Sequence, residues 1–574
     1  MTRKDMMKSK IFAISIAIVV LLGINSCERD LDSRYFEVAT INDIAIEGFI
    51  CGNGSTGVYV DRTIGGRVPQ FEAALTSVFV LDAVLSFELG EANSTLTFGW
   101  YEIDPSVTAH PGSGRLISEE QTLSLPLLAE FSNTTRPYRM KFRVTDTNTG
   151  VSYQRLFEIM VRNPLQIGWY ALTERANGFD IDVIGLFLGE IRQHNSVLDM
   201  MGSTLPREGQ RPLSILAFPN FSAPTILERD LTNYTIMIKT DLATNMVRSA
   251  DFSWEPSFNI SNFVIHNHPV LTPGFKPNRL IPMLSTATAG TATRLYMHHD
   301  DNFYIFNRSG VLLPFWEPVN IMRDTGIRFR VAPFIAGNLG HGVVMFDLDN
   351  RRFVRHAILA AMLMISTPSD QFLMSSLLTD AADAPFSFNT GIESLLYMDT
   401  FHLSQGFAVI RNTSDNYQLF RFTKNANGAT ANAVGTFDND LVASVEHFAM
   451  HQGGVFLYMA TADRVWRVNT AMDPLTAVDI TDQLGLPSGY RISTFDFLST
   501  NGGGQSFQNF LTVGSYNPSG AAGENGRLDI FDVHTGIGAT GDLTLRYHEQ
   551  PNGEEIPMSF TGIGRPVSVA YRGR

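Results

Sequence analysis

Hydrophobic and polar side chains alternate along much of this chain, and the alternation is clearest between Tyr138 and Val161. Apolar residues occupy every second position from Tyr138 to Val144, the turn sequence DTNTG follows, and the alternation resumes from Val151 to Val161. A period of two is typical of strands with one buried face, and a turn between two such strands reverses the chain. The segment therefore predicts a β-hairpin.

Residues 38–163 as a whole show this strand pattern. In LTFGWYEID, for example, Leu96, Phe98 and Trp100 point to one side of an extended chain. Several such strands within one stretch of this length favour an immunoglobulin-like β-sandwich. Asn163 and Pro164 interrupt the pattern, so we place the end of this domain there.

From residue 164 to 574 the chain repeats one loose unit: an apolar strand, a polar turn and a second apolar strand. The repeats begin at Gly168, Tyr234, Leu295, Gly342, Gly406, Val455 and Leu511. Their irregular spacing suits four-stranded blades with long loops, which predicts a β-propeller of about seven blades, with six or eight as alternatives. The final segment, GRPVSVAYRGR, predicts one more strand, which would close the ring by pairing into the first blade.

One segment, HAILAAMLMI from His356 to Ile365, is apolar without alternation. At this length periodicity cannot separate a buried helical turn from a buried strand. We interpret it as core.

The N-terminus has the layout of a secretory signal. Four basic residues stand among the first ten, and an uncharged apolar run, Ile11 to Ile24, follows. The run is shorter than the roughly 20 residues that a membrane-spanning helix needs. Cys27 comes directly after it, as in a bacterial lipobox, so residues 1–26 are expected to be a lipoprotein signal peptide and Cys27 the lipidation site; an ordinary signal peptide is the alternative. Residues 27–37 then form an acidic linker, similar to a surface-export signal.

Composition narrows the possible partners and the source of stability. The chain has two cysteines, and if Cys27 carries lipid, Cys51 has no second cysteine for a disulfide. Charged residues make up 17% and phenylalanine supplies 41 positions, which suits a β-rich protein stabilised by apolar burial. The formal charge of −14, without any long basic run, argues against nucleic acid as a partner.

Several segments in one order resemble the PKD-like family of Bacteroidetes lipoproteins. They are the lipobox, FEVATINDIAIEGF, WYEID, YRMKFRVTDTNTGVSY, GWYALTE, DNRRFV, YMATADRVWRVN and GIGRPVSVAYR. The resemblance covers nearly the whole mature chain and implies a PKD-like sandwich at residues 38–163. It further implies an outer-membrane accessory lipoprotein of starch-utilisation-type uptake loci, beside a TonB-dependent transporter and its lid lipoprotein. The family supplies no catalytic residues, and HAILAAMLMI is more apolar than the family pattern.

Three motifs could carry chemistry, but a simpler explanation exists for each. GNGSTG (Gly52 to Gly57) has the glycine spacing of a dinucleotide fingerprint, but a strand follows it where that motif needs a helix. A zinc site would need His266 and His268 to converge with the MHHDD segment, residues 297–301, whose acids suit a turn. Paired acids recur where hairpins are expected, and turn chemistry explains them without catalysis: Asp180 and Asp182, Asp347 and Asp349, Asp438 and Asp440. We therefore expect no catalytic residue, no metal site and no cofactor.

Phe315 and Trp316 are the candidate ligand-binding residues. They lie between two prolines in PFWEP, where a stiff connection could present their rings to a sugar or a peptide. Packing against a neighbouring blade is the alternative.

We expect a lipoprotein anchored in the outer membrane and facing the cell exterior, which binds a nutrient ligand (oligosaccharide or peptide) and supports a TonB-dependent importer. A propeller glycan hydrolase or lyase is the first alternative, and a non-binding scaffold subunit of an uptake complex is the second. The enzyme requires ionisable groups with shifted pKa values crowded at one end of the ring, whereas a binding protein needs exposed aromatic rings there.

Overall fold

The structure, a computed structural model, describes 41–51, 59–61, 68–75, 77–103, 114–127, 131, 136–187, 189–219, 234–249, 251–263, 275–282, 294–307, 318–338, 342–356, 374–402, 404–425, 428–438, 440–498, 510–535 and 538–572. These residues are almost all-β, as predicted. No helix in these ranges is long and apolar enough to cross a membrane. The chain divides into two compact units. The first comprises the residues up to Phe71, Val78–Pro126 and Tyr138–Ile159, and the second comprises the remainder.

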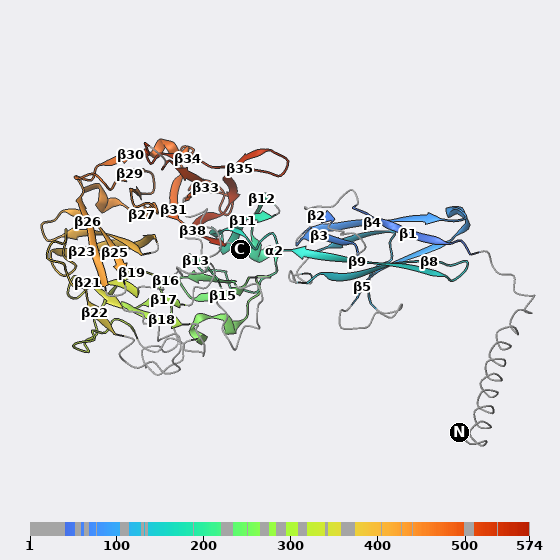
Figure 1. Ribbon diagram of the computed structural model, residues 1–574, viewed down its shortest axis with the longest axis horizontal. Helices are drawn as coiled ribbons and strands as arrows, with labels where there is room; N and C mark the ends of the chain where they lie inside the picture. The colour runs from blue at the N-terminus through green and yellow to red at the C-terminus, as the bar shows by residue number, and fades with distance from the viewer. Residues whose placement is uncertain are drawn as a thin grey trace, which may run out of the picture. The chain divides into compact units, whose positions relative to one another are not determined.

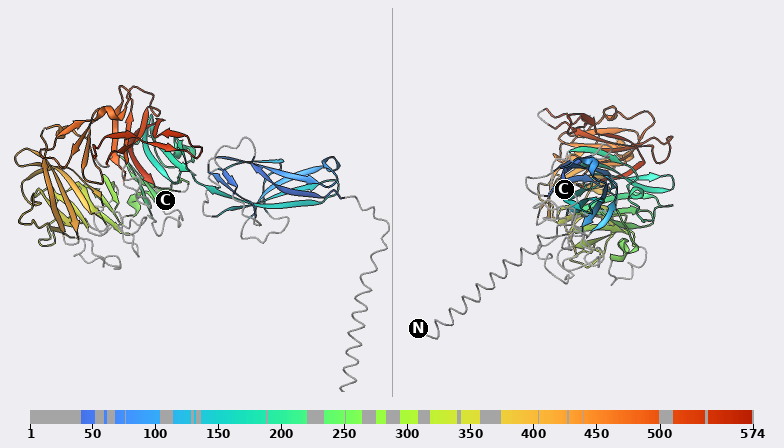
Figure 2. Two further views of the ribbon diagram at one scale, coloured as in Figure 1. Left: turned by 45° about the horizontal axis from the view of Figure 1, so that its top comes forward. Right: turned by 90° about the vertical axis from the view of Figure 1, so that its right-hand side faces the viewer.

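The first unit is built from two sheets, and its blue to cyan strands lie in two layers (Figure 2). One sheet has the order β1 (Ile44–Cys51), β4 (Val78–Phe87), β7 (Thr122–Pro126). The other has the order β2 (Tyr59–Asp61), β3 (Gln70–Ala74), β9 (Ser152–Arg162), β8 (Tyr138–Asp146), β5 (Leu96–Ile103), β6 (Arg115–Ser118). A short 3₁₀ helix, η1 (Glu91–Asn93), precedes β5.

Aromatic side chains fill the space between these two sheets. Phe49 of β1 reaches Phe157 of β9, with ring centroids 4.9 Å apart, and Trp100 of β5 packs on Phe142 of β8 at 4.3 Å. Large rings contribute most to burial because each removes a wide apolar area from water. The predicted hairpin is confirmed, since β8 pairs with β9 in antiparallel register. One position differs: Lys141, expected on the polar face, is only 2% exposed, and its ammonium lies 5.0 Å from the ring centroid of Tyr101.

The second unit contains seven sheets of three to five strands in its described residues, placed one after another in a ring (Figure 1). In chain order the sheets after the first are β13 (Pro212–Pro219), β14 (Tyr234–Thr240), β15 (Thr244–Arg248); β16 (Arg279–Pro282), β17 (Arg294–His299), β18 (Asn302–Asn307); β19 (Val331–Asn338), β20 (Gly342–Asp347), β21 (Arg352–His356), β22 (Ser375–Leu377); β23 (Ile392–His402), β24 (Gln405–Asn412), β25 (Tyr417–Asn425), β26 (Gly428–Thr436); β27 (His447–Met450), β28 (Phe456–Ala460), β29 (Val465–Asn469), β30 (Ala477–Asp479); and β31 (Arg491–Phe497), β32 (Phe510–Tyr516), β33 (Gly526–Val533), β34 (Leu543–Leu545) with β37 (Ser559–Ile563).

The first sheet of the ring joins both ends of the unit. Its order is β12 (Glu190–His194), β11 (Gly178–Phe187), β10 (Gly168–Arg175), β38 (Arg565–Arg572). Besides these sheets the described residues include a two-stranded sheet of β35 (Tyr547–Glu549) and β36 (Glu555–Pro557), the helix α2 (Val197–Met200) and the 3₁₀ helices η3 (Pro256–Phe258), η4 (Ile260–Phe263), η8 (Asp440–Ser444) and η9 (Thr481–Leu484).

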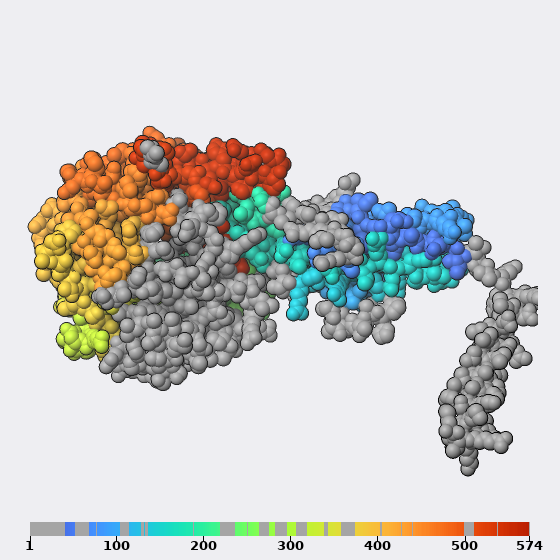
Figure 3. Space-filling view, viewed as in Figure 1, coloured from blue at the N-terminus to red at the C-terminus, as the bar shows by residue number. Residues whose placement is uncertain are grey.

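Each sheet of the ring packs on the next through a buried apolar cluster. One cluster joins β10 and β11 to β13–β15, through Leu172, Ile181 and Ile236 among others. Five further clusters continue this stacking from sheet to sheet, as far as β31–β34. A last cluster returns from β33 to β10, where Leu528 lies with Trp169. The stacking therefore closes on itself, which is a propeller-like arrangement, and the space-filling view follows the same order along the rim from yellow to red (Figure 3).

The terminal strand β38 pairs with β10 as the sequence predicts. Gly168 lies opposite Arg572 in this antiparallel pair and Glu174 opposite Arg565, whose side chains form a 3.1 Å ion pair. Buried Arg572 donates to the Ser249 carbonyl at 3.1 Å. The closing strand thus has side-chain as well as backbone bonds to the start of the unit.

The predicted repeats are confirmed as antiparallel hairpins, which form the second and third strands of their sheets. Between β17 and β18, Asp300 and Asp301 have φ values of 47° and 56°, the left-handed conformation that a tight hairpin turn requires. In HAILAAMLMI, His356 ends β21, and the residues after it lie outside the described ranges.

Candidate functional site

The first strands of four sheets carry polar and aromatic side chains to the middle of the ring. Arg279 comes from β16, Phe334 from β19, Tyr397 and Asp399 from β23, and Asp496 from β31. β16, β19 and β31 are labelled near the middle of the ring in Figure 1. We call these five residues the axial cluster. All of them are at least partly open to solvent, although they belong to inner strands of the fold.

Arg279 lies against two aromatic rings of the axial cluster. Its guanidinium carbon is 4.7 Å from the ring centroid of Phe334 and 5.8 Å from that of Tyr397. The two rings are themselves 5.2 Å apart. Contact with ring faces attracts a cation and restricts the plane of the guanidinium without using its N–H donors.

Asp399 is oriented by its own strand. The Tyr397 hydroxyl donates to Oδ2 of Asp399 at 3.0 Å, and the backbone N–H of Thr400 donates to Oδ1 at 2.7 Å. Burial raises the pKa of Asp399, while the charge of Arg279 opposes the rise. The carboxyl is therefore fixed in place, with its ionised form disfavoured by the loss of water around it.

Lys424 of β25 lies behind this strand, almost fully buried. Its ammonium donates to Oγ1 of Thr400 at 3.0 Å, and the backbone N–H of Gly337 donates to the same oxygen at 2.8 Å. Burial lowers the pKa of Lys424 to about 7, and the charge of Asp399 opposes this shift. Lys424 thus acts on the axial cluster through the field of its charge and through Thr400.

Asp496 is exposed to solvent, yet protein surrounds it on several sides. The resulting desolvation and the charge of Asp399 together raise its pKa to about 7, although the charge of Arg279 opposes this rise. Asp399 and Asp496 belong to sheets that are separated by the β27–β30 sheet. Their mutual influence therefore acts across the middle of the ring and not along a shared sheet face.

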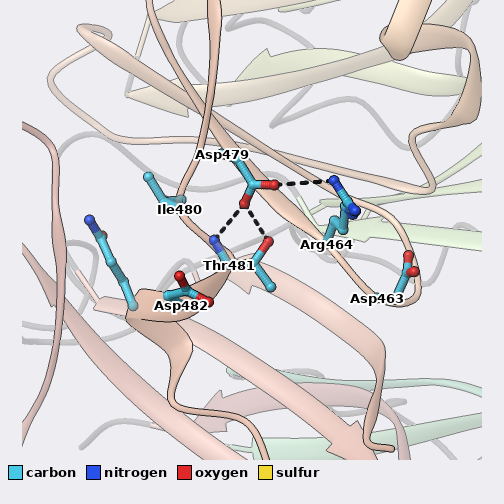
Figure 4. A pocket seen from close by; sticks show the side chains of 7 residues that line it. Asp463, Arg464, Asp479, Ile480, Thr481 and Asp482 are labelled. Atoms are coloured by element: carbon cyan, nitrogen blue, oxygen red, sulfur yellow. Dashed lines mark hydrogen bonds and ion pairs between the residues drawn. The ribbon is translucent and has the colours of Figure 1, made fainter. Parts of the chain in front are cut away.

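A surface hollow of about 540 Å³ is a second candidate. Asp463 and Arg464 line it from the turn between β28 and β29, and Asp479 to Gln483 line it from β30 and η9. Asp479 bonds its neighbours here, with Arg464 at 3.5 Å and the Thr481 hydroxyl at 2.6 Å (Figure 4). Gln483 binds Asp542 and the backbone of Leu543. These bonds fasten η9 to β30 and to the start of β34, so we assign the hollow a structural role.

The described residues that form the axial cluster and the surface hollow are not among the residues proposed from the sequence. Cys27, Phe315, Trp316, His266, His268 and the GNGSTG segment all lie outside the described residues. In the described MHHDD segment, both ring nitrogens of buried His298 have oxygen neighbours, Asn278 Oδ1 and the Val331 carbonyl. Within the described ranges no group of three or more His, Cys, Asp or Glu could hold a metal ion.

Two of the three acid pairs named from the sequence differ in kind. Asp347 accepts the backbone N–H groups of Asp349 and Asn350, each at 3.0 Å, as turn chemistry predicts. For Asp180 and Asp182 the turn explanation is wrong, because both lie buried within β11. Asp182 pairs with Arg175 of the neighbouring strand β10, and Asp180 pairs with Arg207 outside the sheet, so both acids have structural partners.

Sequence reasoning missed the axial cluster. Asp399 stands in LLYMDTF and Asp496 in STFDFL, each the only acid in its apolar segment. A charge inside such a strand is costly unless it is paired or solvated. A lone acid in the strand before a predicted hairpin was therefore the available signal, although it could not show that the two acids meet.

No protein-family model matches the chain, and no curated protein matches it. Solved structures match with low similarity. A quinoprotein alcohol dehydrogenase-like protein from Bacteroides thetaiotaomicron has 10% identity and a TM-score of 0.36, over 88% of this chain and 96% of that one. Dihydro-heme d1 dehydrogenase has 8% identity and a TM-score of 0.32, over 71% and 76%. The WD40 domain of SCAP from fission yeast has 10% and 0.24, over 61% and 70%. These values are too low to indicate a function, and the resemblance to PKD-like lipoproteins stays a prediction.

Proposed function

We propose that this chain is a lipoprotein of the outer membrane, anchored at Cys27 on the cell exterior, which binds a small nutrient ligand and supports a TonB-dependent importer. The observation that carries the binding role is the axial cluster. It gathers an arginine, two carboxyls and two partly exposed rings from four separate strands. Ligand sites typically combine such rings with a few convergent polar groups.

The proposal includes the finer architecture. The seven sheets of the second unit are the blades of a seven-bladed propeller, and the two sheets of the first unit are an immunoglobulin/PKD-like sandwich. The ring of apolar clusters and the pairing of β38 with β10 support the first assignment. The two facing sheets with buried Trp100 support the second.

A propeller glycan hydrolase or lyase is the second candidate, and one observation favours it. Burial raises the pKa values of both Asp399 and Asp496, the latter to about 7. A glycosidase needs one protonated and one ionised carboxyl on opposite sides of the scissile bond. Binding is preferred because both oxygens of Asp399 already accept hydrogen bonds from its own strand, which suits a fixed acceptor better than a group that exchanges protons.

Calorimetry of the purified mature protein with oligosaccharide and peptide mixtures, together with chromatography of the incubated mixtures, tests the proposal. We expect binding in the micromolar range or weaker, about 8 kcal/mol or less, with no released product. Product formation that is lost in Asp496→Asn would establish the enzyme. Absence of binding, combined with co-purification of a transporter from native membranes, would establish a non-binding scaffold.

A further inference from the structure

Aromatic rings hold the guanidinium of Arg279 in place, but they do not use its N–H donors. Rings contact it, as described, and among the described residues no hydrogen bond or ion pair uses its N–H donors. A guanidinium offers five donors in a planar fork that matches a carboxylate. In a partly buried place, donors without a partner favour a ligand that can accept them.

The acids of the axial cluster complement this arginine without neutralising it. Neither Asp399 nor Asp496 forms an ion pair within 4 Å of any cation in the described ranges, although each feels the charge of Arg279. Lys424 is directed to Thr400 instead. The middle of the ring thus holds a cation and two carboxyls. Their charges influence one another, but among the described residues they form no ion pair within 4 Å.

A ligand with one charge of each sign satisfies this arrangement best. We infer that the axial cluster binds a zwitterionic ligand of the amino-acid type, its carboxylate on Arg279 and its ammonium between Asp399 and Asp496. The inference rests on the proposed function and narrows its ligand from oligosaccharide or peptide to amino-acid chemistry. A neutral sugar could hydrogen-bond these groups but would leave their charges uncompensated in a partly desolvated place.

The titration of the acids adds a second consequence. Because the pKa of Asp496 lies at about 7, a fraction of this carboxyl is protonated at neutral pH. A bound ammonium favours the ionised form, so binding of the zwitterion releases protons to the buffer. A neutral sugar would cause no such release.

Calorimetry of the full mature chain with five probes tests the inference. Phenylalanine and the dipeptide Ala-Phe carry both charges, N-acetylphenylalanine lacks the ammonium, phenylalanine amide lacks the carboxylate, and maltotriose carries no charge. Both blocked probes should bind about tenfold more weakly than the zwitterions, as expected for the loss of one charge-assisted contact. The ratio of the affinities for phenylalanine and Ala-Phe distinguishes a site for a free amino acid from a site for the end of a peptide. Titrations in two buffers of different ionisation heat should reveal proton release for phenylalanine and Ala-Phe, which carry the ammonium, and none for N-acetylphenylalanine or maltotriose.

Two variants assign the charges to residues. Arg279→Gln should weaken the zwitterion about tenfold and remove the advantage of phenylalanine over its amide, and Asp496→Asn should remove its advantage over the N-acetyl form. Arg323→Gln and Asp383→Asn change exposed side chains outside the cluster and should alter nothing. Thermal unfolding of all four variants controls for folding.

Two results would overturn the inference in distinguishable ways. Maltotriose binding that weakens in Arg279→Gln, with no binding of the zwitterions, would leave the proposed function intact and exclude amino-acid chemistry. No binding of any probe to the wild type would exclude this ligand class, and the native-membrane co-purification would then decide between a different ligand and a scaffold.

Discussion

Individual carboxyl groups affect the stability of this protein in opposite ways. Asp182 is buried and accepts hydrogen bonds from the hydroxyl of Thr173 and the backbone of Ser196 and Gly564, besides its ion pair with Arg175. Asp496, by contrast, is exposed in the middle of the ring and carries a raised pKa. Asp182 therefore stabilises the fold, whereas ionisation of Asp496 lowers the stability of the fold. Groups with such shifted pKa values are common in functional sites.

Replacing Asp182 with alanine should therefore destabilise the protein strongly. Removal of the carboxylate takes the ion-pair partner from Arg175 and the acceptor from several donors in a buried place, which costs about 3–5 kcal/mol. Urea unfolding measures this loss. Glu393→Ala is the matched control because it breaks an exposed pair with Arg351, where about 0–1 kcal/mol is expected. Equal effects of the two variants would contradict the structural role of Asp182.

Asp496→Asn should change stability in a pH-dependent manner. The folded-state pKa of about 7 exceeds the ordinary value of 3.8, so the folded protein binds more protons between these limits and its stability falls as pH rises through that window. An asparagine avoids this loss. We expect no gain in melting temperature at pH 4 and a gain at pH 8, measured by thermal unfolding. A gain of the same size at both pH values would mean that the ionisation of Asp496 does not cause it.

At the scale of elements, the terminal strand β38 closes the ring. β38 completes the first sheet of the ring, and its Val569 and Tyr571 belong to the cluster that returns from β33 to β10. An all-β ring that lacks this strand exposes both the edge of β10 and an apolar face, and exposed edges pair with other chains.

Removal of residues 565–574 should therefore abolish cooperative unfolding and cause aggregation. Size-exclusion chromatography and circular dichroism measure both effects. Removal of Gly573 and Arg574 alone is the control, because these residues follow the end of β38. If the longer truncation unfolds like the full chain, the closure of the ring by β38 is wrong.

At the scale of the whole molecule, the two compact units should be separable. The second unit has its own closed series of apolar clusters, which is what an independent domain needs. A chain that begins at Leu165 should unfold cooperatively and give a β-type circular dichroism spectrum. A broad transition in this shortened chain, with a sharp one in the full protein, would show that the ring depends on the first unit.

Membrane attachment should depend on Cys27 alone. Acyl chains on this cysteine would anchor the mature protein, since each buried methylene contributes about 0.8 kcal/mol. Cys27→Ser should move the protein from the membrane fraction to the soluble fraction in cell fractionation, with Cys51→Ser as the matched control. Retention of the Cys27→Ser variant in the membrane would contradict the lipoprotein assignment.

The sequence by itself determined the strands and their hairpins. Pairs such as β8 with β9 or β32 with β33 follow from a period of two and a polar turn, which are local properties of adjacent residues. The terminal strand was also predictable, because an isolated apolar strand at the end of a ring has one place in which its edges are covered.

Only the tertiary structure decided which polar side chains meet. Arg279, Asp399 and Asp496 are far apart along the chain and converge because the ring closes, which is a property of all its sheets together. Lys141 occupies a position that alternation marks as polar, yet it is buried, and its ammonium lies near the ring of Tyr101 on the neighbouring strand β5. Asp180 and Asp182 lie in a pattern that fits a turn, but both are buried in β11, where each pairs with an arginine. Alternation fixes the face of a strand to which a residue belongs, whereas burial and ionisation depend on what packs against that face, and distant segments supply it.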